Sequence, residues 1–243
     1  MATENELASA VARRSIGNAP VTRREWPGFA GVRLEGKWVS LAPIDPARDA
    51  TDLFRAATQG EKPDQLWDYL GYGPFADETE MRIWLKGCAE SNDPIFLGYR
   101  DKTTKQLGGM GGFMEIRPAF GVAEIGNIWF GHAWRRDKRS TEAVSLMMHH
   151  TLDTLGYRRL EWKCNALNAP SRAAALRLGF RYEGEFLNHL LVKGRSRDTA
   201  WFSITEAEWP AVRGAHAQWF AENNFDTYGT QKSSLSDLTR ALW

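Results

Sequence analysis

A run of charged residues follows an apolar segment in the middle of the chain. The apolar segment is Ile125–Phe130, and the charged run lies between Trp134 and Ala143. A strand that leads through a turn into a helix aims backbone N–H groups and the positive end of the helix dipole at one point. Such a point suits a phosphate-bearing ligand, and a solvated cationic loop is the alternative interpretation. The candidate ligand-binding residues are Arg135, Arg136, Asp137, Lys138, Arg139, Ser140 and Thr141.

A second group of polar residues follows the charged run. The sequence Asn168-Ala-Pro-Ser171 precedes a short predicted helix, and Gly179 comes directly after that helix. Asn168 is a favourable N-cap, Pro170 suits the first turn, and Gly179 suits the end of a helix. Capping alone explains these residue types. Their position after the cationic turn nevertheless makes Asn168 and Ser171 candidate site residues.

The elements that position these residues show both strand and helix patterns. Polar residues 1–30 form a predicted N-terminal arm, mobile or laid over the surface, and ordered structure is expected from about Leu34. Strands on both sides of a central pair of helices indicate a mixed α/β fold. Strands are predicted at 34–41, 95–99, 107–116, 122–130, 159–164 and 180–187, and around a hairpin connection at 193–198. Helices are predicted at 47–57, from 77, at 141–155, 170–178 and 206–220.

Composition excludes several classes of protein. The chain has 243 residues, of which 43% are hydrophobic and 25% charged, so it can bury a large core. A formal net charge of +1 argues against a protein that wraps nucleic acid over its whole surface. The sequence has no apolar signal segment and no run approaching the roughly 20 apolar residues of a membrane span. We therefore expect a cytoplasmic protein without a membrane partner. Two cysteines alone build neither a disulfide framework nor a zinc site, and no metal is expected.

Together, the cationic turn and the segment from Asn168 to Phe180 resemble the coenzyme A-binding region of the GNAT acyltransferases. In that family the turn usually reads Arg or Gln, two residues, Gly, one residue, and Gly or Ala. Arg135 and Ser140 match this pattern, whereas Lys138 replaces the central glycine. Lysine restricts the backbone angles that glycine permits but adds a positive charge. The Thr141-Glu142-Ala143 sequence is similar to the branch that acetylates ribosomal-protein N-termini (RimJ/RimL-like).

The resemblance implies a fold and a reaction. The fold is α/β (α+β), with a mixed, mostly antiparallel central sheet flanked by helices. The GNAT domain is expected at 31–205, after an arm at 1–30 and before a C-terminal helix and tail at 206–243. The implied co-substrate is acetyl-CoA, whose acetyl group is transferred by direct attack of a primary amine. That amine belongs to a peptide or protein N-terminus or to a small molecule, and the sequence leaves this choice open.

The resemblance also assigns roles to individual residues. Many GNAT enzymes place a tyrosine seven residues after the asparagine as proton donor to sulfur, but here that position is Ala175. The resemblance to the N-terminal acetyltransferase branch implies Ser171 instead as the donor to the thiolate, and Glu124, where that branch often has Glu, as the base acting directly or through water. Asn168 is expected beside the pantetheine arm. The backbone donors that align this arm and polarise the carbonyl fall on Ile128, Trp129 and Phe130.

Other interpretations of these residues compete. Ser171 can serve only as part of a helix cap, and Glu124 as a solvated strand residue. His132, close to the turn, is an alternative base. Cys164 suggests a thiol hydrolase, but no activation motif surrounds it, and a small buried side chain is the simpler interpretation.

The class of function and the acceptor also have alternatives. A non-catalytic acyl-CoA sensor is one, because Lys138 and Ala175 depart from the family pattern; a nucleic-acid-binding protein is a weaker one. The acceptor groove is expected between the aromatic segment at 67–75, the glycine-rich strand at 107–116 and the hairpin at 193–198. Either a monomer or a homodimer is compatible with the sequence. The carboxylates proposed to hold the amine are Asp68, Glu115 and Glu183.

Overall fold

The computed structural model describes residues 21–23, 25–227 and 229–243. The strands are β1 (Leu34–Glu35), β2 (Val39–Pro43), β3 (Ile95–Asp101), β4 (Leu107–Arg117), β5 (Val122–Phe130), β6 (Arg159–Asn165), β7 (Arg181–Val192) and β8 (Arg195–Thr205). In this part of the chain they form an eight-stranded sheet with the order β1-β2-β3-β4-β5-β6-β8-β7. Neighbouring strands pair antiparallel, except β5 and β6, which pair parallel. The predicted mixed, mostly antiparallel sheet is confirmed.

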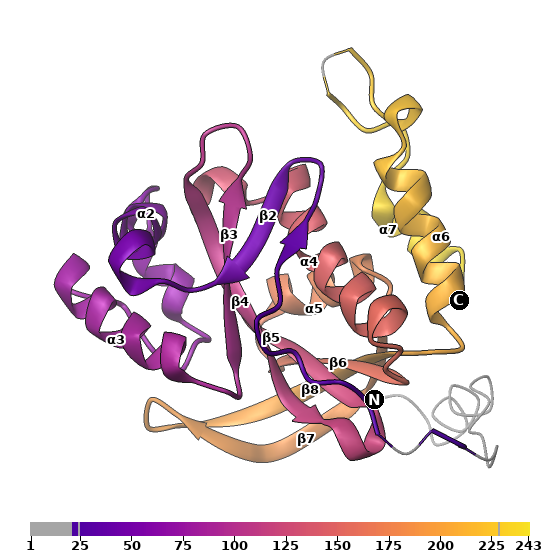
Figure 1. Cartoon of the computed structure of the whole chain (residues 1–243), viewed down its shortest axis with the longest axis horizontal. Coiled ribbons are helices and arrows are strands. Elements are labelled where there is room, and N and C mark those ends of the chain that lie inside the picture. Colours follow the sequence, from indigo (N-terminus) through magenta and orange to yellow (C-terminus); the bar gives the residue numbers. More distant parts are fainter. Residues whose placement is uncertain (1–20, 24, 228) are drawn as a thin grey trace.

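Helices cover both faces of this sheet (Figure 1). The α-helices are α2 (Pro46–Thr58), α3 (Glu78–Glu90), α4 (Lys138–His149), α5 (Ala169–Arg177), α6 (Trp209–Phe220) and α7 (Leu235–Arg240). Helices α2 and α3 lie on one side of the sheet, and α4 lies on the other. Helix α7 packs against both α5 and α6.

Two groups of buried apolar side chains fill the space between the helices and the sheet. One group lies against α4 and includes Met147 and Leu97. The other lies beneath α2 and α3 and includes Leu53, Leu85 and Phe96. Adjacent residues of β3, Phe96 and Leu97, enter different groups because successive strand side chains point to opposite faces. Burying each large apolar side chain stabilises the fold by roughly 1.5–3 kcal/mol.

Helix α4 begins earlier than the sequence pattern predicts. The predicted span was 141–155, whereas the helix runs from Lys138 to His149 and continues as a π-helical turn at His150–Thr154. The side chain of Asp137 accepts the backbone N–H of Arg139 at 2.8 Å and so caps the helix. The charged residues of the turn therefore extend into the first turn of α4.

Two short strands replace the single strand predicted at 34–41. Strands β1 and β2 fold back on each other, and the connection between them is held by Glu142 of α4. The Glu142 carboxylate accepts the backbone N–H groups of Lys37 and Trp38 at 2.7 Å and of Val39 at 2.8 Å. Local alternation does not reveal this turn, because the group that satisfies its N–H donors lies on a distant helix.

The connection between β7 and β8 is shorter than predicted. Instead of the six residues at 193–198, only Lys193 and Gly194 separate the two strands. Their φ angles are 50° and 74°, as in the type I′ turns whose twist matches that of paired strands. The hairpin projects from the sheet on the side of α3 (Figure 1). The Nζ atom of Lys193 donates to the carbonyl of Trp67 at 3.0 Å, which ties the hairpin tip to the aromatic segment.

Glycines in β4 allow close packing inside the sheet. The register of β4 with β5 shifts between Met110 and Gly112, which marks a bulge or irregularity in the strand. A Cβ atom on Gly109 would lie 2.3 Å from the carbonyl oxygen of Trp129, and one on Gly111 would lie 2.1 Å from the hydroxyl of Tyr99. Protein atoms, rather than a ligand, therefore occupy the space beside these two glycines.

Part of the predicted N-terminal arm belongs to the core. Trp26 and Phe29 are buried, and the ring of Phe29 stacks on Phe113 with 4.3 Å between centroids. The indole N–H of Trp26 donates to the carbonyl of Gly156 at 2.6 Å. The expectation that order begins near Leu34 is wrong, because these aromatic side chains close the apolar group beside α4. The first 20 residues of the proposed arm lie outside the described residues, and the proposed domain limits stay a prediction.

Helix α6 is shorter than predicted and is attached to the body by a buried histidine. The helix begins at Trp209 because Glu208, instead of continuing it, accepts the backbone N–H and hydroxyl of Thr205. His216 of α6 lies 3.0 Å from the hydroxyl of Ser145 through Nδ1 and 2.9 Å from the carbonyl of Leu178 through Nε2. Burial lowers the pKa of His216 to about 4. The ring is therefore neutral in the folded protein near neutral pH.

We expect this histidine to make stability depend on pH. The pKa of His216 is about 4 in the folded state and about 6.5 in an unfolded chain. Between these values the unfolded chain binds more protons, so its protonation favours unfolding as pH falls, at a total cost of about 3 kcal/mol. Urea denaturation from pH 7 to pH 4 measures this slope. A His216→Gln variant should lose that part of the slope, and an unchanged slope would contradict the prediction.

Candidate active site

The parallel strands β5 and β6 separate after three paired residues. Their register joins Val122 to Arg159, Ala123 to Leu160 and Glu124 to Glu161. Beyond Glu124, β5 stays paired with β4 and β6 stays paired with β8. Residues 125–130 thus have no strand partner on the β6 side within the described part of the chain, although the hydroxyl of Tyr72 donates to the carbonyl of Asn127 at 3.4 Å.

A pocket of about 380 Å³ opens where the two strands separate. Its size falls within the range of small-molecule sites. The pocket is formed by the loop between Trp67 and α3, by β4, β5 and β6, by the start of α5, and by the β7–β8 hairpin. Its lining residues are Tyr69, Leu70, Gly71, Met114, Glu115, Glu124, Ile125, Gly126, Asn127, Ile128, Trp162, Lys163, Cys164, Asn165, Asn168, Ser171, His189, Leu190, Arg197, Thr199 and Trp201.

Glu124 is a buried carboxylate in this pocket. Its side chain is almost inaccessible, with the whole residue 4% exposed, and Oε2 lies 2.8 Å from Nζ of Lys163. Burial raises the pKa of Glu124 above its ordinary value, and the positive charge of Lys163 opposes this without cancelling it. A carboxylate whose pKa is shifted toward neutrality is well suited to accept a proton at neutral pH. The solvated-strand interpretation of Glu124 is therefore wrong.

Lys163 is held by three neighbours. It contacts Glu124 and, at 3.2 Å, the carboxylate of Glu161. Its ammonium also lies 4.2 Å from the centre of the Trp201 ring, an arrangement in which a cation is attracted to an aromatic face. Arg117 and Arg159 neutralise Glu161 from the other side, at 2.5 and 2.8 Å. This network fixes the position of Lys163 beneath Glu124.

Asn168 and Ser171 lie at the start of α5. The Asn168 side chain accepts the backbone N–H of Ser171 at 3.1 Å, which is the expected helix cap. The hydroxyl of Ser171 accepts the indole N–H of Trp162 at 3.0 Å. Ser171 also has a hydrogen bond with the thiol of Cys164, and its hydroxyl keeps one proton that it can donate. Both side chains line the pocket, so the cap and a role in the site are compatible.

The cations of the turn differ in exposure and in ion pairing. Arg135, Arg136 and Lys138 are exposed at the N-terminus of α4, and the ammonium of Lys138 lies 4.7 Å from the centre of the Trp38 ring. Arg139 instead forms ion pairs with Asp101 at 2.6 Å and Asp137 at 2.8 Å. Because its charge is already neutralised, Arg139 is less suited to bind a phosphate than the three exposed cations.

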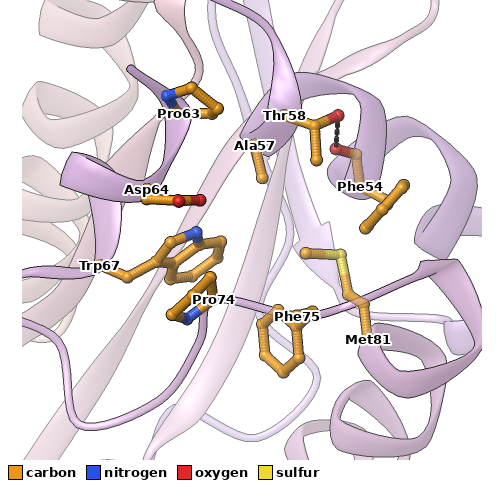
Figure 2. A pocket seen from close by; sticks show the side chains of 9 residues that line it. All are labelled: Phe54, Ala57, Thr58, Pro63, Asp64, Trp67, Pro74, Phe75 and Met81. Atoms are coloured by element: carbon orange, nitrogen blue, oxygen red, sulfur yellow. Dashed lines mark hydrogen bonds between the residues drawn. The ribbon is translucent and has the colours of Figure 1, made fainter.

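The aromatic segment at 67–75 is partly packed in the interior and partly exposed to the large pocket. Trp67 is buried and packs edge-on against Phe75, with 5.3 Å between ring centroids, and against Trp129 at 5.5 Å. Figure 2 shows Trp67 next to Pro74 and Phe75. The hollow that these residues help to line has a volume of only about 20 Å³, too small for a substrate. Tyr69 lies on the other side, lines the large pocket and donates to the carbonyl of Leu167 at 3.1 Å.

Comparison with known proteins identifies this arrangement. Residues 39–181, more than half of the chain, match the family model for the acetyltransferase (GNAT) domain. The chain belongs to the GNAT acetyltransferase family. A GCN5-related N-acetyltransferase from Brucella melitensis is 41% identical, with a TM-score of 0.87 over 90% of this chain and 99% of the other. A probable acetyltransferase from Chromobacterium violaceum is 36% identical, with a TM-score of 0.74 over 80% and 98%.

A curated relative supports the same family assignment. The uncharacterized N-acetyltransferase p20 of Bacillus licheniformis is 29% identical over 151 residues, which are 60% of this chain and 83% of that protein. Structures of ribosomal-protein acetyltransferases, at 23% and 18% identity, share the fold. Acetyl transfer is therefore the general activity of the family to which this chain belongs.

Two residues considered for other roles, His132 as a base and Cys164 as a nucleophile, do not suit those roles in this structure. His132 is exposed and is not among the residues that line the pocket. Cys164 does line it, but burial raises the pKa of its thiol, although a hydrogen bond to Ser171 opposes the shift. Reactive cysteines require a lowered pKa. The thiol-hydrolase interpretation therefore has no support.

Of the three carboxylates proposed to hold an amine, one lines the pocket and two do not. Glu115 lines the pocket, whereas Asp68 does not. Glu183 is engaged by Arg159 and by the hydroxyl of Ser203 at 2.8 Å. Among the described residues, no group of His, Cys, Asp or Glu side chains is arranged to hold a metal ion, and no helix is long and apolar enough to cross a membrane.

The sequence analysis gave no role to Lys163 and Trp201, and it included Arg197 only as part of the segment at 193–198 expected at the acceptor groove; all three line the pocket. Lys163 and Trp201 are directly opposite each other in the register of β6 and β8. Arg197 lies on the same face of β8 as Trp201, because side chains two and four residues apart on a strand share a face. The only sequence signal was alternation, which places a polar residue on the outer face of a strand without showing that a pocket lies there.

Proposed function

We propose that the protein transfers the acetyl group of acetyl-CoA to a primary amine by direct attack. The observation that carries this proposal is Glu124, buried with a raised pKa at the point where β5 and β6 separate. A base at this place can take a proton from an ammonium group that enters the pocket. The N–C bond of the product forms as the C–S bond of the thioester breaks.

The residues around the pocket suit acetyl-CoA as co-substrate. Arg135, Arg136 and Lys138 are exposed at the N-terminus of α4, where cations and backbone N–H groups favour phosphates. The unpaired edge of β5 would provide N–H groups to the pantetheine arm, with Asn168 beside it. Acetyl-CoA supplies an activated acyl group when bound. The backbone donors proposed for it remain Ile128, Trp129 and Phe130.

Two side chains would carry the proton transfers. Glu124 accepts the proton of the amine, directly or through water, and Ser171 donates its hydroxyl proton to the departing thiolate and regains a proton from water. The hydrogen bond from Trp162 orients the Ser171 hydroxyl. Lys163 would keep Glu124 in place without removing its basicity, since the net shift of the Glu124 pKa is upward.

The RimJ/RimL-like branch, and with it a peptide or protein N-terminus as acceptor, is supported by the resemblance at Asn168–Phe180. Solved structures named as ribosomal-protein acetyltransferases share the fold. The Thr141-Glu142-Ala143 motif gives no separate support, because Glu142 holds the β1–β2 connection. A small-molecule amine is the other candidate acceptor. A cytoplasmic location, a monomer or homodimer, and the absence of nucleic-acid and membrane partners remain predictions.

Calorimetric titration with acetyl-CoA tests the co-substrate and its turn. We expect micromolar binding, weakened at least tenfold in an Arg135→Ala/Arg136→Ala variant, because charged hydrogen bonds contribute about 1.5–3 kcal/mol each. An Arg33→Ala/Lys86→Ala variant, which removes two exposed charges elsewhere, should bind like the wild type. No binding by the wild type would exclude the proposed function. Binding without turnover over a broad amine panel would favour the sensor alternative instead.

A further inference from the structure

The pocket contains a guanidinium group that the proposed proton transfers do not use. Arg197 of β8 is half-buried and lines the pocket beside Leu190 and Thr199. Its Nε atom is fully buried and has no hydrogen-bond partner in the described part of the chain. A buried donor left unpaired is costly and uncommon in folded proteins. The position therefore favours a ligand that supplies the missing acceptor.

The charges of the pocket are divided between its two sides. Glu124 and the exposed Glu115 lie on the side formed by β4 and β5, whereas Arg197 lies on the β7–β8 hairpin. Lys163 is neutralised by two carboxylates. Arg197 forms no ion pair with any described residue, and burial lowers its pKa, with Cys164 and Glu124 opposing the shift only in part. A carboxylate next to Arg197 would give this guanidinium a partner of opposite charge.

We propose that Arg197 binds a carboxylate of the acceptor, so that the acceptor is an amine that also carries a carboxylate group. This inference rests on the proposed function, and it narrows the acceptor from primary amines in general to zwitterionic ones. The amine faces Glu124 and the carboxylate pairs with the guanidinium, whose planar donors match two carboxylate oxygens. A free amino acid and a peptide with an acidic residue near its N-terminus both present these groups.

Matched pairs of amines test the proposal. Free amino acids are compared with their α-amides, and tripeptides with Asp at the second position with those that have Asn there. For each pair, kcat/KM is measured by release of free coenzyme A, and binding of the amine in the presence of coenzyme A is measured by calorimetry. The wild type should prefer the carboxylate member of at least one pair by tenfold or more. The pair type that shows the preference identifies the source of the carboxylate.

In the Arg197→Gln variant, the ratio of kcat/KM for the carboxylate member of the pair to kcat/KM for its neutral partner should fall close to one. Its affinity for acetyl-CoA should stay within about twofold of the wild-type value. Arg195→Gln removes an exposed charge two residues away on the same strand and should keep the wild-type ratio. An equal preference in Arg197→Gln and wild type, or no preference in any pair, would overturn the proposal. If the protein fails to acetylate amines, the proposed function fails, and the calorimetric ratios still decide the role of Arg197.

Discussion

Replacing Glu124 by Gln is expected to lower kcat by at least about 100-fold, the usual contribution of a proton-transfer group. The substitution keeps the size of the side chain, and Lys163 retains Glu161 as a partner at 3.2 Å. The loss should therefore lie in the chemical step. Steady-state kinetics with saturating acetyl-CoA measure it, and circular dichroism checks that the variant is folded.

The pH profile separates a base from a merely structural carboxylate. Because burial raises the pKa of Glu124, kcat/KM of the wild type should fall on the acid side at a pH above the pKa of an ordinary glutamate. That limb should disappear in Glu124→Gln. Glu115→Gln changes an exposed carboxylate lining the same pocket and is the matched control: the limb should persist, moved to lower pH because the charge of Glu115 helps to raise the pKa of Glu124. Rates of Glu124→Gln within threefold of wild type would remove Glu124 from the mechanism.

Replacing Glu142 by Ala is expected to lower the free energy of unfolding by about 3 kcal/mol or more. The substitution leaves the N–H groups of Lys37, Trp38 and Val39 without their acceptor; the bond to Val39 is buried and the other two are partly buried. A buried unsatisfied donor costs about 1–3 kcal/mol, and partly buried ones cost less because water can reach them. Urea denaturation at neutral pH measures the change.

Two further protein variants test whether the loss of stability comes from the Glu142 carboxylate. Glu142→Gln keeps one oxygen acceptor and should lose less stability than Glu142→Ala. Glu90→Ala changes an exposed residue at the end of α3 and should unfold within about 0.5 kcal/mol of wild type, as surface substitutions usually do. A Glu142→Ala variant as stable as the wild type would show that the β1–β2 connection does not depend on this carboxylate.

Local signals in the sequence were sufficient for much of the framework. The strand at 122–130 was predicted with its observed limits, and the helix after Asn168 has the expected cap, with Asn168 accepting the N–H of Ser171. Gly179 has a φ of 94°, a value that favours glycine after a helix. These features depend on residues within a few positions of one another, so their types and spacing are enough to predict them.

Tertiary structure decided what the polar residues do. The sequence did not show that Glu142 reaches the β1–β2 connection, that Lys163 lies beneath Glu124, or that Arg197 enters the same pocket. Each relation joins elements far apart in the chain, through strand register and the separation of β5 from β6. The free energy of burying a charge and the free energy of pairing groups across strands both depend on which neighbouring groups exclude water from the side chain. Residue type and local spacing do not contain that information, and it arises only when the sheet has formed.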